Sequence, residues 1–221
     1  MPLNFILILL LSIPALAQTG QPTFKGGTRN LENFITTNLI YPEYAKQNCL
    51  QGIVNVSFKL NKQGKIVDSE VQNGSGIDLD LEALRVVRLS SGKWVVPPDY
   101  DTTVAVVLPV NFSLKDYQCE QRSKDDINAA IAAYHARQDL SKAIYNYYEK
   151  RDQGHYYPEE EGRILALKSQ LGYDEKYIDR LLRQALRKLK QGDQESACDD
   201  FHTIHNLGSN KADSWISKTC K

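Results

Sequence analysis

The chain has 221 residues, and its 27 lysine and arginine residues are balanced by 27 aspartate and glutamate residues. This length allows one or two domains, each with a hydrophobic core of its own. The neutral charge balance argues against a general nucleic-acid binder, which needs a basic surface to neutralise phosphates. It also gives no polybasic reason for the chain to sit on an anionic membrane.

The N-terminus has the pattern of an export signal. A continuous apolar run from Phe5 to Leu11 is followed by Pro14 and the small-residue motif Ala15-Leu16-Ala17. The run is shorter than the ~20 residues that span a bilayer. We therefore expect residues 1–17 to be a signal peptide that is cleaved after Ala17. The alternative is an uncleaved run that anchors the chain in a membrane.

The next segments predict a lead-in and two short helical pieces. Residues 18–30 are polar and predict a flexible lead-in. A helix is expected from Leu31 to Asn38, because its apolar side chains fall on one helical face. Pro42 is expected to open a second short turn that runs to Gln47.

Two strands and a helix are predicted next. Apolar and polar residues alternate from Val54 to Leu60, and a turn that ends at Gly64 leads to a returning strand from Ile66 to Val71. Together these segments predict an antiparallel hairpin. A helix that runs to about Leu89 follows, with Asp78 or Asp80 as its expected cap.

A long strand from Thr103 to Phe112 ends this region. Alternate apolar residues, including Val104, place one face of the strand in the core. Pro109 has no N–H to donate to a sheet ladder, so the strand is expected at a sheet edge.

A series of short motifs occurs in a specific order between residues 24 and 114. They are Tyr41-Pro42-Glu43-Tyr44-Ala45, Gly52-Ile53-Val54-Asn55-Val56-Ser57-Phe58, Gly64-Lys65-Ile66-Val67-Asp68, Gly74-Ser75-Gly76, Leu79-Asp80, Ala83-Leu84, Trp94, Pro97 and Leu108-Pro109-Val110-Asn111-Phe112. In order and spacing they resemble the TonB C-terminal domain family. The resemblance implies an α+β fold, a three-stranded antiparallel sheet with helices on one face, over residues 31–114.

The resemblance also implies a role. Members of this family couple the inner-membrane proton motive force to outer-membrane receptors, through a transmembrane anchor and a long proline-rich spacer. Here the apolar run looks cleavable, and the lead-in is too short to cross a periplasm at about 3.1 Å per extended residue. We expect a periplasmic, non-enzymatic binding module that is accessory to outer-membrane transport. If the run is not cleaved, the alternative is an inner-membrane-anchored transducer that faces the periplasm.

Strand addition is the expected binding mode. An exposed sheet edge offers unpaired N–H and C=O groups with which an extended peptide can pair. The expected partner is a protein or an extended peptide, such as a segment of an outer-membrane receptor. The alternative is that the helical tail covers this edge, or that water solvates it. The backbone groups are expected from Thr103, Val104, Ala105, Val107 and Asn111.

From residue 123 to residue 221 the apolar period becomes helical, which predicts an all-α domain. Gly192, Ala197 and Phe201 are spaced as in the second half of a tetratricopeptide repeat, and Ala143 and Tyr147 echo this spacing. The two echoes are not ~34 residues apart, so the array is degenerate. A scaffold whose helical tail binds protein is therefore a second functional hypothesis, and a tail that only caps its neighbour is the alternative. The expected helices are Ser123–Arg137, Leu140–Lys150, one that begins at Pro158 and ends at Gly172, Asp174–Gln191, Asp193–Leu207 and Ser209–Cys220.

Four cysteines in an exported chain predict disulfides. Cys198 and Cys220 lie in consecutive predicted helices, and a bridge between antiparallel helices fits the geometry of a disulfide. Cys49 precedes the first strand and Cys119 follows the last, so antiparallel pairing of those strands brings them to the same end of the sheet. The expected pairs are Cys198–Cys220 and Cys49–Cys119, and the alternative is buried free thiols.

No catalytic or cofactor motif is present in the sequence. It contains no nucleophile elbow, Walker loop, dinucleotide fingerprint or HExxH motif. Cys198, His202 and His205 share a helix face at metal-ligand spacing, but a convincing site needs a closed shell of oriented ligands. We expect no metal, no cofactor and no enzymatic activity.

Overall fold

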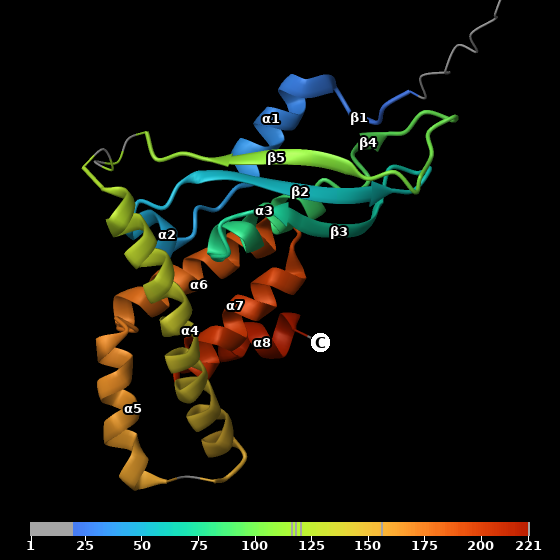
Figure 1. Cartoon of the computed structure of the whole chain (residues 1–221). Helices are drawn as coiled ribbons and strands as arrows, with labels where there is room; N and C mark the ends of the chain where they lie inside the picture. The colour runs from blue at the N-terminus through green and yellow to red at the C-terminus, as the bar shows by residue number, and fades with distance from the viewer. Residues whose placement is uncertain (1–19, 116, 118, 120, 156, 221) are drawn as a thin grey trace, which may run out of the picture.

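The computed structural model describes residues 20–115, 117, 119, 121–155 and 157–220. Figure 1 shows a twisted sheet with helices packed on it and a helical tail that extends below the sheet. The predicted α+β domain followed by a helical region is confirmed. The predicted signal peptide, residues 1–17, lies outside the described residues.

Three antiparallel strands form the main sheet, with β2 (Gly52–Leu60) at its centre. On one side β2 pairs with β3 (Ile66–Asn73), which is the predicted hairpin. On the other side it pairs with β5 (Val106–Phe112), from Gly52 opposite Phe112 to Phe58 opposite Val106. Among the described residues β2 is the one strand that pairs with β5, so β5 is an edge strand of the described sheet.

The remaining elements of the first domain surround this sheet. Trp94 in the short strand β4 pairs with Phe24 in β1, and this pair forms a small second sheet. Most apolar side chains of α1 and α3 face the core of the main sheet. The elements are β1 (Thr23–Phe24), α1 (Gly27–Asn38), α2 (Glu43–Gln47), α3 (Asp78–Arg88) and β4 (Trp94–Val95).

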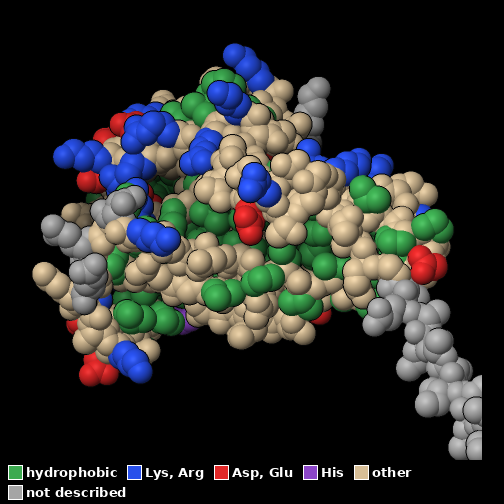
Figure 2. Space-filling view, turned by 90° about the horizontal axis from the view of Figure 1, so that it is seen from above, with side chains coloured by type: hydrophobic (Ala, Val, Ile, Leu, Met, Phe, Trp, Pro, Cys, Tyr) green, Lys and Arg blue, Asp and Glu red, His purple; other side chains and the backbone are tan. Residues whose placement is uncertain are grey.

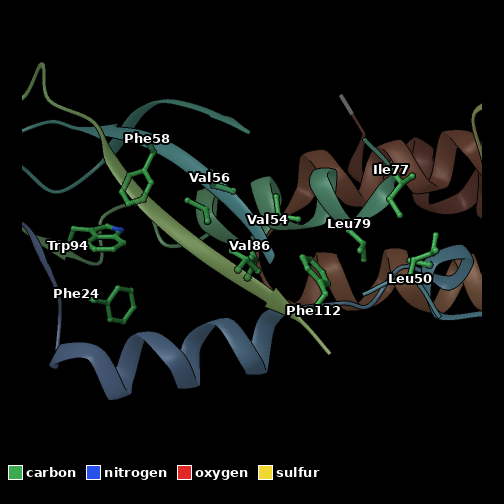
Figure 3. Packing of buried hydrophobic residues seen from close by; sticks show 14 of the residues in the cluster. Phe24, Leu50, Val54, Val56, Phe58, Ile77, Leu79, Val86, Trp94 and Phe112 are labelled. Atoms are coloured by element: carbon green, nitrogen blue, oxygen red, sulfur yellow. The ribbon is translucent and has the colours of Figure 1, made fainter. Parts of the chain in front are cut away.

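One face of the main sheet carries the core. Figure 3 shows side chains of β2, α3 and β5 meeting there, with Phe24 and Trp94 closing one end. Alternate residues of β2 point into this layer because successive strand side chains point to opposite faces. The fully buried residues of the layer include Val54, Val56, Phe58, Leu60, Leu79, Val86, Val87 and Phe112.

The prediction of a flexible lead-in over residues 18–30 is wrong for its described part. Phe24 is buried and packs edge-on against Trp94, with 5.6 Å between ring centroids. Helix α1 begins at Gly27, four residues before the predicted start. The buried ring of Phe24 therefore orders a segment whose sequence is otherwise mostly polar.

The predicted start of the last strand is also wrong. The Asp101 carboxylate accepts hydrogen bonds from the Thr103 amide at 2.9 Å and from the Thr103 hydroxyl at 2.8 Å. The Val104 amide donates to the Asp101 carbonyl. This Asx-type turn keeps Thr103, Val104 and Ala105 out of the ladder, and β5 begins at Val106.

Predicted caps and helix breaks differ from the structure in two places. Helix α3 has Ile77 at its N-cap without a side-chain cap, while Asp80 accepts from the amides of Ser75 and Gly76. The two helices predicted over Ser123–Arg137 and Leu140–Lys150 are one continuous helix, because no glycine or proline separates them.

A second hydrophobic core holds the tail together. Ala197 and Phe201 are fully buried in it, where α6 and α7 pack side by side. Ile144 and Tyr148 of α4 close the other side of this core. The tail elements are α4 (Lys124–Asp152), α5 (Pro158–Gln170), α6 (Glu175–Lys190), α7 (Gln194–Asn206), the 3-10 helix η1 (Asn210–Ala212) and α8 (Asp213–Thr219).

Both expected disulfides are present in the structure. Cys49 is bonded to Cys119, which ties the segment after β5 to the start of β2. Cys198 is bonded to Cys220, which ties the end of α8 to α7. Among the described residues, no helix has the length and apolar character needed to cross a membrane.

Two glycines with positive φ, Gly64 in the turn between β2 and β3 and Gly92 between α3 and β4, give a matched pair of tests. Gly64 has φ +74°, and a Cβ there would lie 2.1 Å from the backbone carbonyl oxygen of Trp94. Gly92 has φ +79°, but a Cβ there would meet no atom within 4 Å. Gly92→Ala should therefore cost only the left-handed backbone strain of about 1–2 kcal/mol.

Gly64→Ala should lower the free energy of unfolding by about 3 kcal/mol or more, because a backbone clash adds to the strain. Urea unfolding of both variants measures the difference. Equal losses in the two variants would show that the approach of Trp94 to the turn is not a constraint.

His205 links three helices of the tail. Its Nδ1 lies 2.8 Å from Asp213 and its Nε2 lies 2.8 Å from Asp152. The hydrogen bond to Asp213, followed by that to Asp152, raises the pKa of His205 above its ordinary value of 6.5. Protonation then favours the folded state below pH 6.5, and this contribution is lost as the pH rises through the raised pKa.

His205→Gln should therefore destabilise the protein more at pH 6 than at pH 9. The expected loss at pH 6 is about 0.5–1 kcal/mol, because solvent screens this partly exposed group. Thermal unfolding across that pH range measures it, with the exposed His202→Gln as the matched control. A difference that grows towards alkaline pH would contradict the assignment.

Candidate functional site

The free edge of β5 is the candidate protein-binding site. Opposite residues of an antiparallel pair alternate between exchanging two hydrogen bonds and exchanging none. Pro109 stands opposite Asn55 and has no N–H to exchange. If the Pro109–Asn55 pair is a non-hydrogen-bonded one, the ladder between β5 and β2 loses no bond at Pro109. The N–H and C=O groups of alternate residues, Val107, Pro109 and Asn111, then point away from β2, except that Pro109 has only a C=O.

A contact beyond the end of β5 agrees with this assignment. The Leu114 amide donates to the Gln51 side chain at 2.6 Å, just before β2 begins. This contact is consistent with even-numbered residues directing their N–H groups towards β2, as the position of Pro109 implies. The outward edge offers N–H donors at Val107 and Asn111, while Pro109 offers only its carbonyl oxygen.

The helices α6, α7 and α8 of the tail pack away from this edge. Apart from β2, the main contacts of β5 are with α3, which lies on the core face. In Figure 1 helices α6, α7 and α8 lie on the α3 and β3 side of the sheet, away from the β5 edge. The alternative in which the tail covers β5 therefore has no support in the structure.

The face of β5 that points away from the core is partly apolar. Val107 is 46% exposed, and Ile53 on the neighbouring strand is 59% exposed. Figure 2, seen from the top of Figure 1, shows exposed hydrophobic side chains near the middle of the molecule and Lys and Arg side chains gathered at the upper left. A guest strand on β5 would have apolar side chains beside it as well as free backbone groups.

The predicted edge residues divide into two groups in the structure. Val107 and Asn111 lie in β5. Thr103, Val104 and Ala105 precede the strand and do not belong to its edge. The alternation of apolar residues could not reveal this, because the Asx-type turn that begins at Asp101 extends into the alternating run.

A buried ionic network joins the two halves of the chain. Arg85 of α3 binds the Glu82 carboxylate through Nε and Nη2, at 2.7 Å each. Its Nη1 also lies 3.2 Å from Asp193, in the tail. Burial lowers the pKa of Arg85, but the hydrogen bonds and charges of Glu82 and Asp193 outweigh it and raise that pKa, so the guanidinium stays charged.

The last carbonyl groups of α1 complete the junction. The Asn38 carbonyl accepts from Arg85 at 2.7 Å and from Gln191 at 3.0 Å. Arg187 donates to the carbonyls of Thr37 and Leu39, both at 3.2 Å. Helix C-terminal carbonyls lack partners within their own helix, so the tail supplies them here. Sequence reasoning missed this junction, since no local motif marks it.

A cavity of about 1240 Å³ lies beside this junction, between α3 and the tail helices α4, α6 and α7. Asp78 on its wall has a carboxylate oxygen without a hydrogen-bond partner among the described residues. Burial raises the pKa of Asp78 to about 6.

The candidate metal ligands are already occupied. Cys198 forms a disulfide and therefore has no thiolate to offer. His205 is bonded to Asp152 and Asp213. Within the described part of the chain, no group of three potential ligands is close enough to hold a metal ion.

Comparison with known proteins identifies the first domain. Residues 37–114 match the family model described as Gram-negative bacterial TonB protein C-terminal. The resemblance to the TonB C-terminal family is thereby confirmed for this segment, which is about a third of the chain. The match ends at residue 114, so the likeness of the tail to tetratricopeptide repeats stays a prediction.

One similar solved structure is the TonB C-terminal domain of Helicobacter pylori, determined in solution by NMR. It shares 25% sequence identity, and the match covers 39% of this chain and 92% of that one, with a TM-score of 0.34. A comparison with curated proteins finds no match.

The junction of the TonB C-terminal-like domain with the tail can be tested at Arg85. Arg85→Met should lower the free energy of unfolding by about 3–5 kcal/mol, because it leaves the buried Glu82 carboxylate without its cation. Urea unfolding measures the loss. Arg88→Met, on the same helix but exposed, is the control and should change stability by about 0.5 kcal/mol or less. Similar losses in both variants would contradict the role of this network.

Proposed function

We propose that this chain is an exported periplasmic protein that binds an extended peptide by strand addition to β5. Its role is accessory to outer-membrane transport, and its partner is a segment of an outer-membrane receptor or transporter. The family match over residues 37–114 supports the class of function. The observation that carries the binding mode is that, among the described residues, β5 pairs with one strand and its second edge pairs with none.

The chemistry of the edge sets how a guest strand would pair. A guest can accept hydrogen bonds from the amides of Val107 and Asn111 and donate to the carbonyl oxygens of the edge. Pro109 interrupts the donors at the middle of the strand, since it has no N–H. The edge is thus open to a short guest but is a poor template for continuous pairing with another sheet.

The binding mode can be tested by adding a backbone N–H donor to the edge at Pro109 and by removing one at Asn111. Pro109→Ala supplies the missing outward donor without removing a bond to β2. It should tighten peptide binding by about 2- to 10-fold, the effect of one hydrogen bond of about 0.5–1.5 kcal/mol. Asn111→Pro removes an existing outward donor and should weaken binding by a similar factor.

The measurement is fluorescence polarisation with labelled peptides copied from periplasm-facing segments of outer-membrane transporters of the same organism. Asn111→Ala is the matched control, because it keeps the backbone N–H and changes only the side chain. If Asn111→Pro and Asn111→Ala bind equally well, the peptide does not pair with β5.

A further inference from the structure

The cavity between the two halves has the composition of a recognition site. Its volume of about 1240 Å³ exceeds the ~300–1,000 Å³ of typical small-molecule pockets, so it can hold a segment of peptide. Tyrosine and arginine are enriched at the energetic centres of protein interfaces. The tyrosines that line the cavity are Tyr44, Tyr134, Tyr145, Tyr173 and Tyr177.

Arg137 of α4 lies near two of these rings. Its guanidinium is 4.7 Å from the centroid of the Tyr173 ring and 5.6 Å from that of Tyr44. Its Nε lies 3.4 Å from the Tyr173 hydroxyl. Tyr44 comes from the first domain and Tyr173 from the tail, so both halves of the chain contact this guanidinium.

Other half-buried or buried cations on the cavity wall already have acid partners. Arg85 has Glu82 and Asp193, as described above. Arg180 lies 3.2 Å from Glu43, and Lys188 lies 2.7 Å from Asp200. Arg137 differs, because within the described residues no carboxylate lies at ion-pair distance from it and its terminal nitrogens have no hydrogen-bond partner.

We propose that this cavity binds a partner peptide through a carboxylate that pairs with Arg137. A guanidinium presents two parallel N–H groups that match the two oxygens of a carboxylate, and the contacts with Tyr44 and Tyr173 restrict where this fork can move. The surrounding tyrosines would contact the rest of the peptide. The site is separate from the β5 edge and does not rest on strand addition.

Small probes test the carboxylate requirement directly. N-acetylglycine represents a C-terminal carboxylate, N-acetylaspartic acid α-amide represents a side-chain carboxylate, and N-acetylglycinamide has neither. NMR of the full chain would follow the side-chain Nε–H signal of Arg137. We expect saturable shifts with one or both carboxylates, with dissociation constants in the millimolar range, and no saturable shift with the amide. The stronger of the two carboxylate probes identifies the source.

Two variants separate recognition from structure. Arg137→Lys keeps the charge but loses the planar fork, and should weaken binding of the preferred carboxylate by about tenfold. Because the variant has no Arg137 Nε–H, its binding is followed through the backbone amide signals of residues that line the cavity, with the unmodified protein measured in the same way. Arg88→Lys is the matched control, because Arg88 lines the same cavity but is exposed and hydrogen-bonded to Ser69. It should leave binding unchanged, and the amide spectrum of each variant would verify its fold.

Three outcomes would overturn the proposal. One is the absence of a saturable shift in the unmodified protein, which would leave Arg137 as a structural contact between the two halves. Another is equal binding of N-acetylglycine and its amide. The third is tighter binding of N-acetylglucosamine than of either carboxylate, which would identify a sugar site.

Discussion

The pairing of β5 with β2 is the constraint on which the first domain and the proposed binding edge depend. Its register places Pro109 opposite Asn55 and Phe112 opposite Gly52. That register fixes which side chains of β5 enter the core, because strand side chains alternate between faces. It also fixes which backbone groups face outwards, since hydrogen-bonded and non-hydrogen-bonded pairs alternate along the same strand. A shift by one residue would reverse both at once.

The position of the tail follows from a different interaction. Arg85 is buried with an acid from each half of the chain, and the end of α1 receives donors from α6 and from Gln191 just after it. These partners lie on the α3 side of the first domain, so the tail docks there. The Cys49–Cys119 bond restrains the connection after β5 at the start of β2. Together they explain why a tail that follows directly after an edge strand does not fold back over that edge.

Much of the fold could be predicted from the sequence, because its signals are local. The alternation of apolar and polar residues predicts β2 as a strand and shows which of its side chains face the core. The missing N–H of Pro109 predicts that β5 lies at a sheet edge. The errors arise where a distant contact or a side-chain turn overrides the local pattern. Phe24 is ordered by Trp94, about 70 residues away, and the turn at Asp101 delays the start of β5 to Val106. The setting of Arg137 could not be predicted, because its two rings come from separate parts of the chain.

The two candidate sites differ in how they could recognise a partner. The β5 edge offers backbone groups, which any extended peptide can match, so it favours conformation over sequence. The cavity offers a fixed guanidinium and several tyrosines, which select for a charged group and for shape. The edge lies on one side of the sheet and the cavity on the side of α3. A partner that reached both would gain affinity through effective concentration rather than through any new contact. The docking of the tail at Arg85 would then set the distance that such a partner must span.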